Sequence, residues 1–492
     1  MAPSSSSSTK ALDDFQDRIS NLPDAIILHI LSFLPTIDVV STSFLSHRWK
    51  LMWYLIPDLS FSITTTNYKT VKEQEKALNY IDLCLEHRKR GMYFIRDSFL
   101  NSFKLQMDCY YKRKTGRYID KWLAFAVLRR VKHVSLCLNA GEPDEYGENY
   151  FRLPNSLVLH AKFLTSLELN GVELDRYCVF TFPSLKSLTM INVHIANRFV
   201  IDKLMLGTPS LEKLLLNCYY NTFHPHQLHI RSLSLKLLEI KLVKIQSVAE
   251  RMIKQIEIKN LESLKLERVS FDKLKFSSCK TIKNLSLTCY WDMEESPTLE
   301  RFVSNLPLLE KLTLSNWSEG RLKRIKISNQ KLESLNVNNP YDDEMNVVIE
   351  SAPKLASFCY NGNLNFSISM VSSNLLNGTF GIVERRKHYD IDWFINMINF
   401  LINLNCSWNV VTIHVDKPEA LIFPNKLKNV IGHMKSVSRT PLVKLEHLRV
   451  LTECKPERES DLRDTLLCIS PYLKTLSIAK GESSQNFSAQ VL

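Results

Sequence analysis

Residues 17–35 read DRISNLPDAIILHILSFLP, and residues 45–53 read LSHRWKLMW. Pro23 stands where the first turn of a helix tolerates proline, and Asp24 adds a negative charge that suits the positive end of a helix. Pro35 is expected to end that helix, because a residue that precedes proline is displaced from the helical region. Apolar residues occupy both sides of the helix between the two prolines. The stretch therefore predicts a small helical module with more apolar surface than its own core can bury.

Two further helical segments complete this module. A second short helix is expected after Thr36 and carries Val39 and Val40, and a third segment runs from Phe44 to Trp53. The apolar pattern alone fits two interpretations. The module is either the N-terminal core of a larger domain or one half of an interface with a partner.

Composition limits the classes of protein that the chain can form. A length of 492 residues predicts two or more domains or one extended solenoid. Only 12 glycines are present, which argues against a glycine-rich cofactor loop as the organising device. The net charge of +12 suits nucleic acid, anionic lipid or an acidic protein partner, and charge alone does not choose among them.

Cysteine usage and the first residues bear on the compartment. The 11 cysteines include no CxxC pair, which excludes a disulfide framework and a zinc signature and favours a reducing cytoplasm or nucleus. Residues 1–16 are expected to be a disordered, serine-rich tail without a secretory signal. No segment approaches the ~20 apolar residues that span a bilayer, so no membrane partner is expected.

Three segments of the opening stretch carry a family resemblance. Residues 17–24, 30–35 and 45–50 closely resemble, in residue type and spacing, the F-box of plant F-box/leucine-rich-repeat (LRR) proteins. The resemblance implies a three-helix F-box over residues 17–61 that binds a Skp-type adaptor, and through it a cullin, in an SCF (Skp–cullin–F-box) ubiquitin ligase. The motif positions, which the sequence does not sort into adaptor-facing and core residues, are Leu22, Pro23, Ile26, Ile30, Leu34, Val39, Leu45 and Trp49.

A helical connector is expected over residues 62–98. A short strand at Phe61–Thr66 precedes a helix over Val71–Arg90, whose basic end and Gly91 are typical of a helix C-terminus, although the basic tetrad at 87–90 could also be a nuclear import signal. Strand, helix and strand then follow at Phe103–Met107, Tyr118–Arg129 and Val131–Leu138, as in a crossover unit. The basic and aromatic loop at 110–118 is interpreted as a solvated connection rather than a grip on nucleic acid.

A repeated LxxLxL pattern dominates residues 99–380. Nine units recur at a mean spacing of about 24 residues, the leucine-rich-repeat period, and their first residues are Leu164, Leu185, Leu211, Leu235, Leu261, Ile282, Leu309, Leu332 and Leu355. The second and third apolar residues of each unit should fill the interior, because side chains alternate along a strand. The predicted fold is therefore α/β, a three-helix F-box followed by an irregular LRR solenoid with a parallel sheet.

The residues between those leucines should face outward. They are candidates for binding a protein substrate, with a merely solvated sheet face as the alternative: Glu168, Lys213, Glu239, Lys241, Lys265, Glu267 and Lys311. Valines stand where the common repeat has asparagine, so a regular asparagine ladder is not expected at Val172, Val193, Val243 and Val269. Residues 322–327 lie too close to the next unit for a full repeat, and their path stays open.

Residues 381–492 are expected to continue and cap the solenoid. After a charged break at Glu384–His388, a helix is predicted over Ile391–Leu404, a strand over Val410–Val415 and a helix over Asp461–Ile469. LxxLxL returns at Leu445–Val450 and Leu473–Ile478. The final segment resembles the C-terminal FBD region of the same family.

Catalytic signatures are missing from the sequence. There is no Walker loop, HExxH, GxSxG or kinase motif set, and His224, His226 and His229 are interpreted as surface histidines, so neither a metal nor a cofactor is expected. The leading hypothesis is a non-catalytic substrate receptor of a ubiquitin ligase, located in the nucleus or cytoplasm. The alternatives are a basic solenoid that binds nucleic acid, which the mixed charges of the outward positions disfavour, and a receptor for a small molecule or hormone.

Overall fold

The computed structural model describes residue 19 and residues 21–64, 66–91, 99–108, 114–138, 151–175, 177–195, 198–219, 228–243, 253–271, 274–277, 279–290, 294–316, 322–339, 344–371, 374–383, 388–428, 442 and 444–480. The chain forms two compact units, Met1–Ser210 and Leu211–Leu492. The predicted tail at 1–16, the histidines His224 and His226, and residues 384–387 lie outside the described residues.

Three short helices open the first unit: α1 (Asp24–Leu31), α2 (Thr36–Thr42) and α3 (His47–Leu55). The expectation that Pro35 ends α1 was wrong. The helix already ends at Leu31, where the Ser32 hydroxyl donates to the His29 carbonyl oxygen at 2.6 Å and turns the chain. Pro35 instead precedes α2 as its N-cap residue, just as Pro23 precedes α1.

A parallel crossover follows these helices. β1 (Asp58–Ile63) pairs in parallel with β2 (Ser102–Met107), and α4 (Val71–Gly91) connects them. The region expected to be only a connector thus holds the helix of the first crossover unit. β1 begins three residues before the predicted Phe61, and α5 (Lys114–Leu128) begins four residues before the predicted Tyr118.

The rest of the first unit adds strands to the same parallel sheet, in the order β1, β2, β3, β5, β7. A smaller parallel sheet consists of β4, β6 and β8. The bounds are β3 (His133–Leu138), β4 (Phe151–Arg152), α6 (Asn155–His160), β5 (Ser166–Asn170), β6 (Val172–Leu174), β7 (Ser187–Ile191), β8 (His194–Ile195) and α7 (Arg198–Gly207).

The second unit repeats one strand of the main sheet per coil, again in parallel. The order is β9, β11, β13, β15, β16, β18, β20, β22, β24, β25, β26. The bounds are β9 (Lys213–Tyr219), β11 (Leu237–Val243), β13 (Ser263–Ser270), β15 (Asn284–Tyr290), β16 (Lys311–Asn316), β18 (Ser334–Asn339), β20 (Ser357–Gly362), β22 (Leu376–Ile382), β24 (Trp408–His414), β25 (His447–Leu451) and β26 (Thr475–Ala479).

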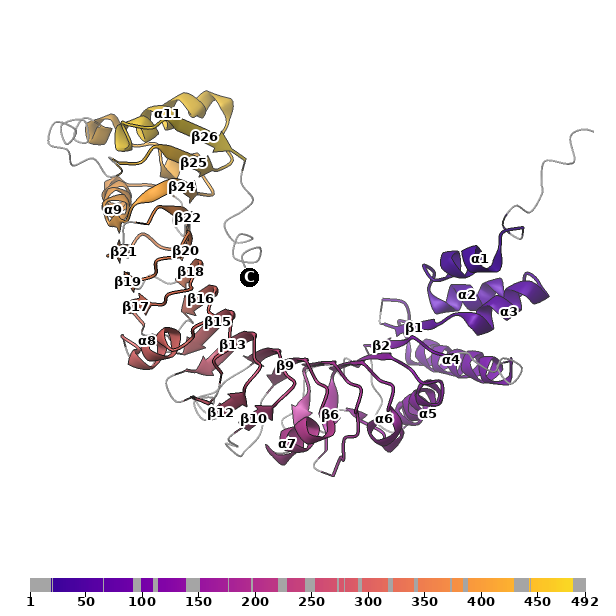
Figure 1. Cartoon of the computed structure of the whole chain (residues 1–492). Helices are drawn as coiled ribbons and strands as arrows, with labels where there is room; N and C mark the ends of the chain where they lie inside the picture. The colour runs from indigo at the N-terminus through magenta and orange to yellow at the C-terminus, as the bar shows by residue number, and fades with distance from the viewer. Residues whose placement is uncertain are drawn as a thin grey trace, which may run out of the picture. The chain divides into compact units, whose positions relative to one another are not determined.

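A second row of short strands and helices lies behind this sheet (Figure 1). It comprises β10 (Leu228–Ser232), β12 (Ile253–Ile258), β14 (Lys275–Ser277), α8 (Pro297–Ser304), β17 (Arg324–Ser328), β19 (Met345–Ser351), β21 (Phe366–Met370), α9 (Ile391–Ile402), β23 (Leu404–Asn405), the 3-10 helix η3 (Pro418–Ala420) and α11 (Pro456–Ile469). Among the described residues, no helix is both long and apolar enough to cross a membrane.

The back row settles the path of residues 322–327. β17 pairs in parallel with β19 in the sheet β17-β19-β21-β23, and does not belong to the main sheet. The segment is therefore the rear strand of a coil, which explains why it lies only a few residues before the next LxxLxL unit.

The repeated leucines form the core, as the sequence predicts. The apolar side chains at all three positions of the nine units are at most 2% exposed. Fully burying one such side chain contributes roughly 1.5–3 kcal/mol. Three of the valines that replace the usual asparagine, Val172, Val193 and Val269, are buried as well, and the side chain of Val243 lies outside the described part.

Arg88 joins the opening helices to the first crossover. The basic residues at the end of α4 were expected to form the last turn of the helix with Gly91 as its cap, but α4 runs through Gly91 and Arg88 is buried. Its guanidinium donates to the Trp53 carbonyl oxygen at 2.9 Å and to that of Ile56, and lies 4.8 Å from the Trp53 ring centroid.

These contacts place a cation at the carboxyl end of α3. That end carries unpaired carbonyls and partial negative charge, so a buried cation there is stabilised without a carboxylate. Burial, with a smaller effect of Arg129, lowers the pKa of Arg88 to about 9, so the group remains charged at neutral pH.

Arg88→Met should destabilise the first unit by on the order of 3 kcal/mol, because it leaves two buried carbonyls without donors. Thermal unfolding of the whole chain measures the effect. Arg90→Met is the matched control, since Arg90 is exposed on the same helix turn. An equal loss of stability in both variants would contradict the role assigned to Arg88.

Candidate docking and recognition surfaces

The three opening helices form a small module with a buried interior and an exposed surface. Its interior consists of buried side chains from all three helices: Ile27, Leu31, Val39, Val40, Trp49, Met52 and Trp53. The backbone N–H of Ser60 donates to the Thr36 hydroxyl at 2.7 Å and so attaches α2 to β1. The module is thus fixed on the first strand of the sheet.

The eight motif residues divide between these two sides. Pro23, Ile26, Ile30, Leu34 and Leu45 are exposed, and Leu22 is half-buried. Val39 and Trp49 instead lie in the interior, which gives them a packing role within the module. Sequence could not separate the two groups, because both belong to one apolar pattern.

Arg48 fixes the segment that begins this exposed surface. Its guanidinium donates to the Leu22 carbonyl oxygen at 2.5 Å and to Asp24 Oδ1 at 2.5 and 2.9 Å. The Leu22–Pro23 segment therefore holds a defined position against the start of α3.

Sequence reasoning left out two of the most exposed apolar residues. Phe33 and Phe44, in the turns that follow α1 and α2, are 75% and 85% exposed. Together with four exposed motif residues and Leu51 they make up a set of exposed large apolar side chains, called the docking face: Ile26, Ile30, Phe33, Leu34, Phe44, Leu45 and Leu51. The sequence signal for an exposed apolar surface in this module was the apolar character of both sides of α1, which is more than one core can bury. Exposed apolar surface of this extent is typical of a protein interface.

Four of the seven outward candidates meet in one ion-pair network on the sheet face. The parallel register places Glu239 opposite Lys265 and Lys241 opposite Glu267. Lys265 Nζ lies 3.2 Å from Glu239 Oε1 and 3.1 Å from Glu267 Oε1, and Lys241 Nζ lies 2.9 Å from Glu267 Oε2.

The ion-pair network shifts the pKa values of Glu267 and Lys265. Burial by itself would raise the pKa of Glu267, but hydrogen bonds from Lys241 and Lys265 outweigh it and hold that pKa below its usual value. Burial opposes the charge of Lys265 too, yet its two glutamate partners raise its pKa. These four side chains largely neutralise one another.

The other three candidates do not join the network. Lys213 and Lys311 are exposed on β9 and β16 of the second unit. Glu168 belongs to the first unit, where it accepts a hydrogen bond from the Ser135 hydroxyl at 2.9 Å.

A neutral polar face follows the ion pairs, and the sequence analysis did not single it out. From β15 to β22 the register aligns serine, threonine and asparagine side chains in rows. One row runs Thr288, Ser315, Asn338, Asn361, in which the first three side chains are half-buried and Asn361 is buried. The Asn338 amide donates to the Ser315 hydroxyl at 3.0 Å. This part of the sheet can recognise hydrogen-bonding groups without selecting for charge.

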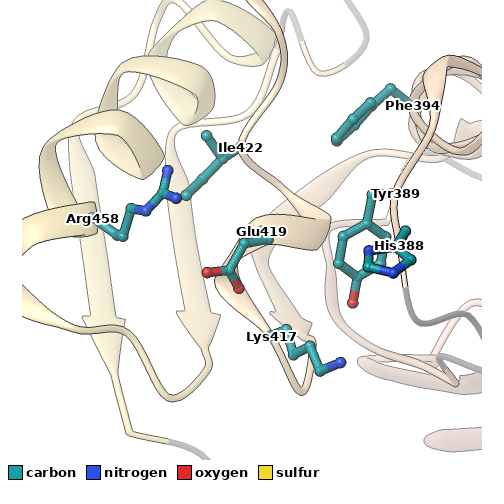
Figure 2. Close-up of a pocket in the computed structure, with 7 residues that line it drawn as sticks. All are labelled: His388, Tyr389, Phe394, Lys417, Glu419, Ile422 and Arg458. Atoms are coloured by element: carbon teal, nitrogen blue, oxygen red, sulfur yellow. The ribbon is translucent and has the colours of Figure 1, made fainter.

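A pocket of about 470 Å³ lies in the C-terminal part of the second unit. Figure 2 shows Tyr389 and His388 on one side, Arg458 and Ile422 on the other, and Glu419 and Lys417 between them, with Phe394 from α9 above. Glu419 stands among the cations, and Arg458 already lies 3.7 Å from Asp461. The mixed charge gives no strong preference for an anion, and the pocket lies beside α9, η3 and α11 rather than on the sheet face.

Metal-binding chemistry has no support in the described residues, where no group of three or more His, Cys, Asp and Glu side chains could hold an ion. Of the three histidines considered from sequence, the described one, His229, lies on β10.

Family models match two regions of the chain. Residues 19–55 match the F-box domain, and residues 98–320 match the At1g61320/AtMIF1 LRR domain. The chain thus has an N-terminal F-box followed by an LRR region, as its sequence predicts.

Curated proteins of Arabidopsis thaliana are similar to part of the chain. A putative FBD-associated F-box protein, At3g50710, is 31% identical over 44% of this chain and 47% of its own length. F-box/LRR-repeat protein 13 is 32% identical over 41% of each chain, and F-box/FBD/LRR-repeat protein At1g78750 is 31% identical over 41% of this chain and 42% of its own. The chain thus spans less than half the length of these relatives.

The network on the sheet face predicts acid sensitivity. Because folding lowers the pKa of Glu267, its carboxylate stabilises the fold above the unfolded value near 4.5, and this contribution disappears as the pH falls through the lower folded value. Wild type should therefore exceed Glu267→Gln in melting temperature at pH 7, and the gap should close in acid. Glu262→Gln, at a more exposed pair with Lys283, should show little gap at either pH. A gap for Glu267→Gln that persists below the lowered pKa would contradict the assignment.

Proposed function

We propose that this F-box/LRR chain is the substrate-recognition subunit of an SCF-type ubiquitin ligase. The F-box docks on a Skp-type adaptor and through it on a cullin, and the LRR sheet holds a protein substrate. The single observation that carries the proposal is the docking face, a set of large apolar side chains exposed on α1–α3 and the turns between them.

The F-box module and the repeats differ in how they bury their apolar residues, and this difference supports the proposal. The repeats bury their own leucines by stacking, so they place no demand on the apolar surface of the docking face. A folded module that keeps such a surface in water is stabilised when a partner covers it. The adaptor contacts are assigned to the exposed members, with Val39 and Trp49 supporting them from inside.

Catalysis in this proposal is by proximity alone. A substrate held on the sheet face stands near the charged conjugating enzyme of the complex, and holding the two together raises the effective concentration of the substrate lysine. The chain contributes binding and orientation, and the reacting groups belong to its partners.

The nucleic-acid alternative gains no specific support from the sheet face. Lys213 and Lys311 are exposed on β9 and β16, but Lys241 and Lys265 are already paired with glutamates. Phosphate binding relies on cations that exchange counterions, which the two paired lysines do not offer.

Phe44→Asp combined with Leu45→Asp should abolish co-purification with a recombinant Skp-type adaptor and its cullin. Each charge would be buried against apolar adaptor surface, and losing two anchors of about 2 kcal/mol each lowers affinity roughly a thousandfold. Both side chains are exposed, so the fold should be unaffected. Leu206→Asp, on α7 and 83% exposed, is the control for adding charge at an exposed leucine. Undiminished adaptor binding by the double variant would refute the docking face.

A further inference from the structure

Three successive turns of the first unit place one arginine between two phenylalanine rings, an arrangement called the stack. Phe99, Arg130 and Phe163 each directly precede the buried first apolar residue of a coil. The turns are joined by backbone hydrogen bonds, from Leu100 N to Arg129 O and from Thr165 N to Lys132 O. The guanidinium carbon of Arg130 lies 5.7 Å from the Phe99 ring centroid and 5.1 Å from that of Phe163.

Arg130 occupies a backbone position that favours glycine. Its φ of 54° is left-handed, and it follows α5 in a Schellman motif, with Val131 N donating to Ala126 O and Arg130 N donating to Val127 O. A side chain there costs about 1 kcal/mol relative to glycine. A residue that violates a local preference in this way points to a role for its side chain.

The stack leaves much apolar surface in water. Phe99 and Phe163 are 51% and 52% exposed, and Leu128, two residues before Arg130, is 75% exposed. Arginine and aromatic residues, phenylalanine included, are enriched at protein interfaces. An arginine held between rings still presents its N–H groups at the edge, where a carboxylate can accept two of them.

The charge around the stack has one sign. Residues 99–101, 129–133 and 161–166 contain Arg129, Arg130, Lys132 and Lys162 but no acid. Within the described part of the chain, Lys132 and Lys162 make no ion pair. Asp58, on the neighbouring β1, already accepts hydrogen bonds from Asn101 and Ser102 at 3.0 and 2.7 Å.

We propose that these residues form an interaction surface, the Arg130 patch, that binds an acidic protein segment bearing a large apolar side chain. The carboxylates of the segment pair with Arg130, Lys132 and Lys162, while its apolar side chain covers Leu128 and the phenylalanine rings. A single-stranded nucleic acid fits less well, because base stacking needs free ring faces. Arg130 covers one face of each ring, and Leu128 offers no π-surface. The surface is separate from the docking face and extends the proposed function.

Arg130→Gly provides a test that separates binding from folding. Glycine is preferred at the left-handed position, so the variant should melt no lower than wild type while it lacks the central cation. Arg268→Gly is the matched control, since Arg268 also has a left-handed φ, of 60°, and the substitution removes the same charge from the second unit. Phe163→Ser is a second variant of the patch.

The probe is a fluorescein-labelled peptide of repeated Glu-Glu-Leu-Phe, measured on the full chain by anisotropy. Its comparisons are the Gln-Gln-Leu-Phe peptide and a single-stranded oligonucleotide of equal charge. The acidic peptide should bind wild type and Arg268→Gly alike and bind Arg130→Gly and Phe163→Ser about tenfold more weakly. Equal weakening by Arg130→Gly and Arg268→Gly would overturn the proposal. So would equal affinity for the glutamine peptide, or an oligonucleotide affinity that depends more strongly on Arg130 than the peptide affinity does.

Discussion

Leu285 on β15 lies opposite Leu312 on β16, and Leu287 lies opposite Leu314, so each leucine rests on its counterpart in the next coil. The parallel register repeats this arrangement along the sheet of each unit. A coil cannot bury its own apolar edge, and its strand cannot satisfy its own N–H and C=O groups, so both needs are met only by neighbours. The repeats therefore stabilise one another, and the opening helices are left with an apolar face that no described part of the chain covers.

The junction between those helices and the first crossover uses a different interaction. Arg88 lies in the interior with carbonyl oxygens and the Trp53 ring as its partners. A buried cation is usually costly, but the carboxyl end of α3 supplies several acceptors and a favourable dipole at one point. The docking helices thus pack directly against the helix of the first crossover through α3.

Register also decides which surfaces are available for recognition. In a parallel sheet, residues at the same repeat position become direct neighbours, so Glu239 meets Lys265 and Lys241 meets Glu267. Residues chosen from the sequence as separate binding candidates thereby become partners of one another. Uncharged polar side chains lie elsewhere, in the rows of β15 to β22, and exposed cations lie in the turns around Arg130. Sequence could have pointed to Arg130 only through the break in the usual glycine preference after a helix.

The sequence by itself determined the periodic features. The two prolines and the apolar run indicated the three opening helices. The LxxLxL spacing predicted the buried apolar residues from Leu164 to Tyr360. Both predictions succeed because helix and strand periods are local properties of the chain. Tertiary structure alone decided which residues meet. It placed Val39 and Trp49 inside, buried Arg88, set β17 behind the main sheet and paired the charges of β11 and β13. These outcomes depend on register and packing between segments many residues apart, and a local pattern of residue types holds no information about which distant side chain will fill a given position.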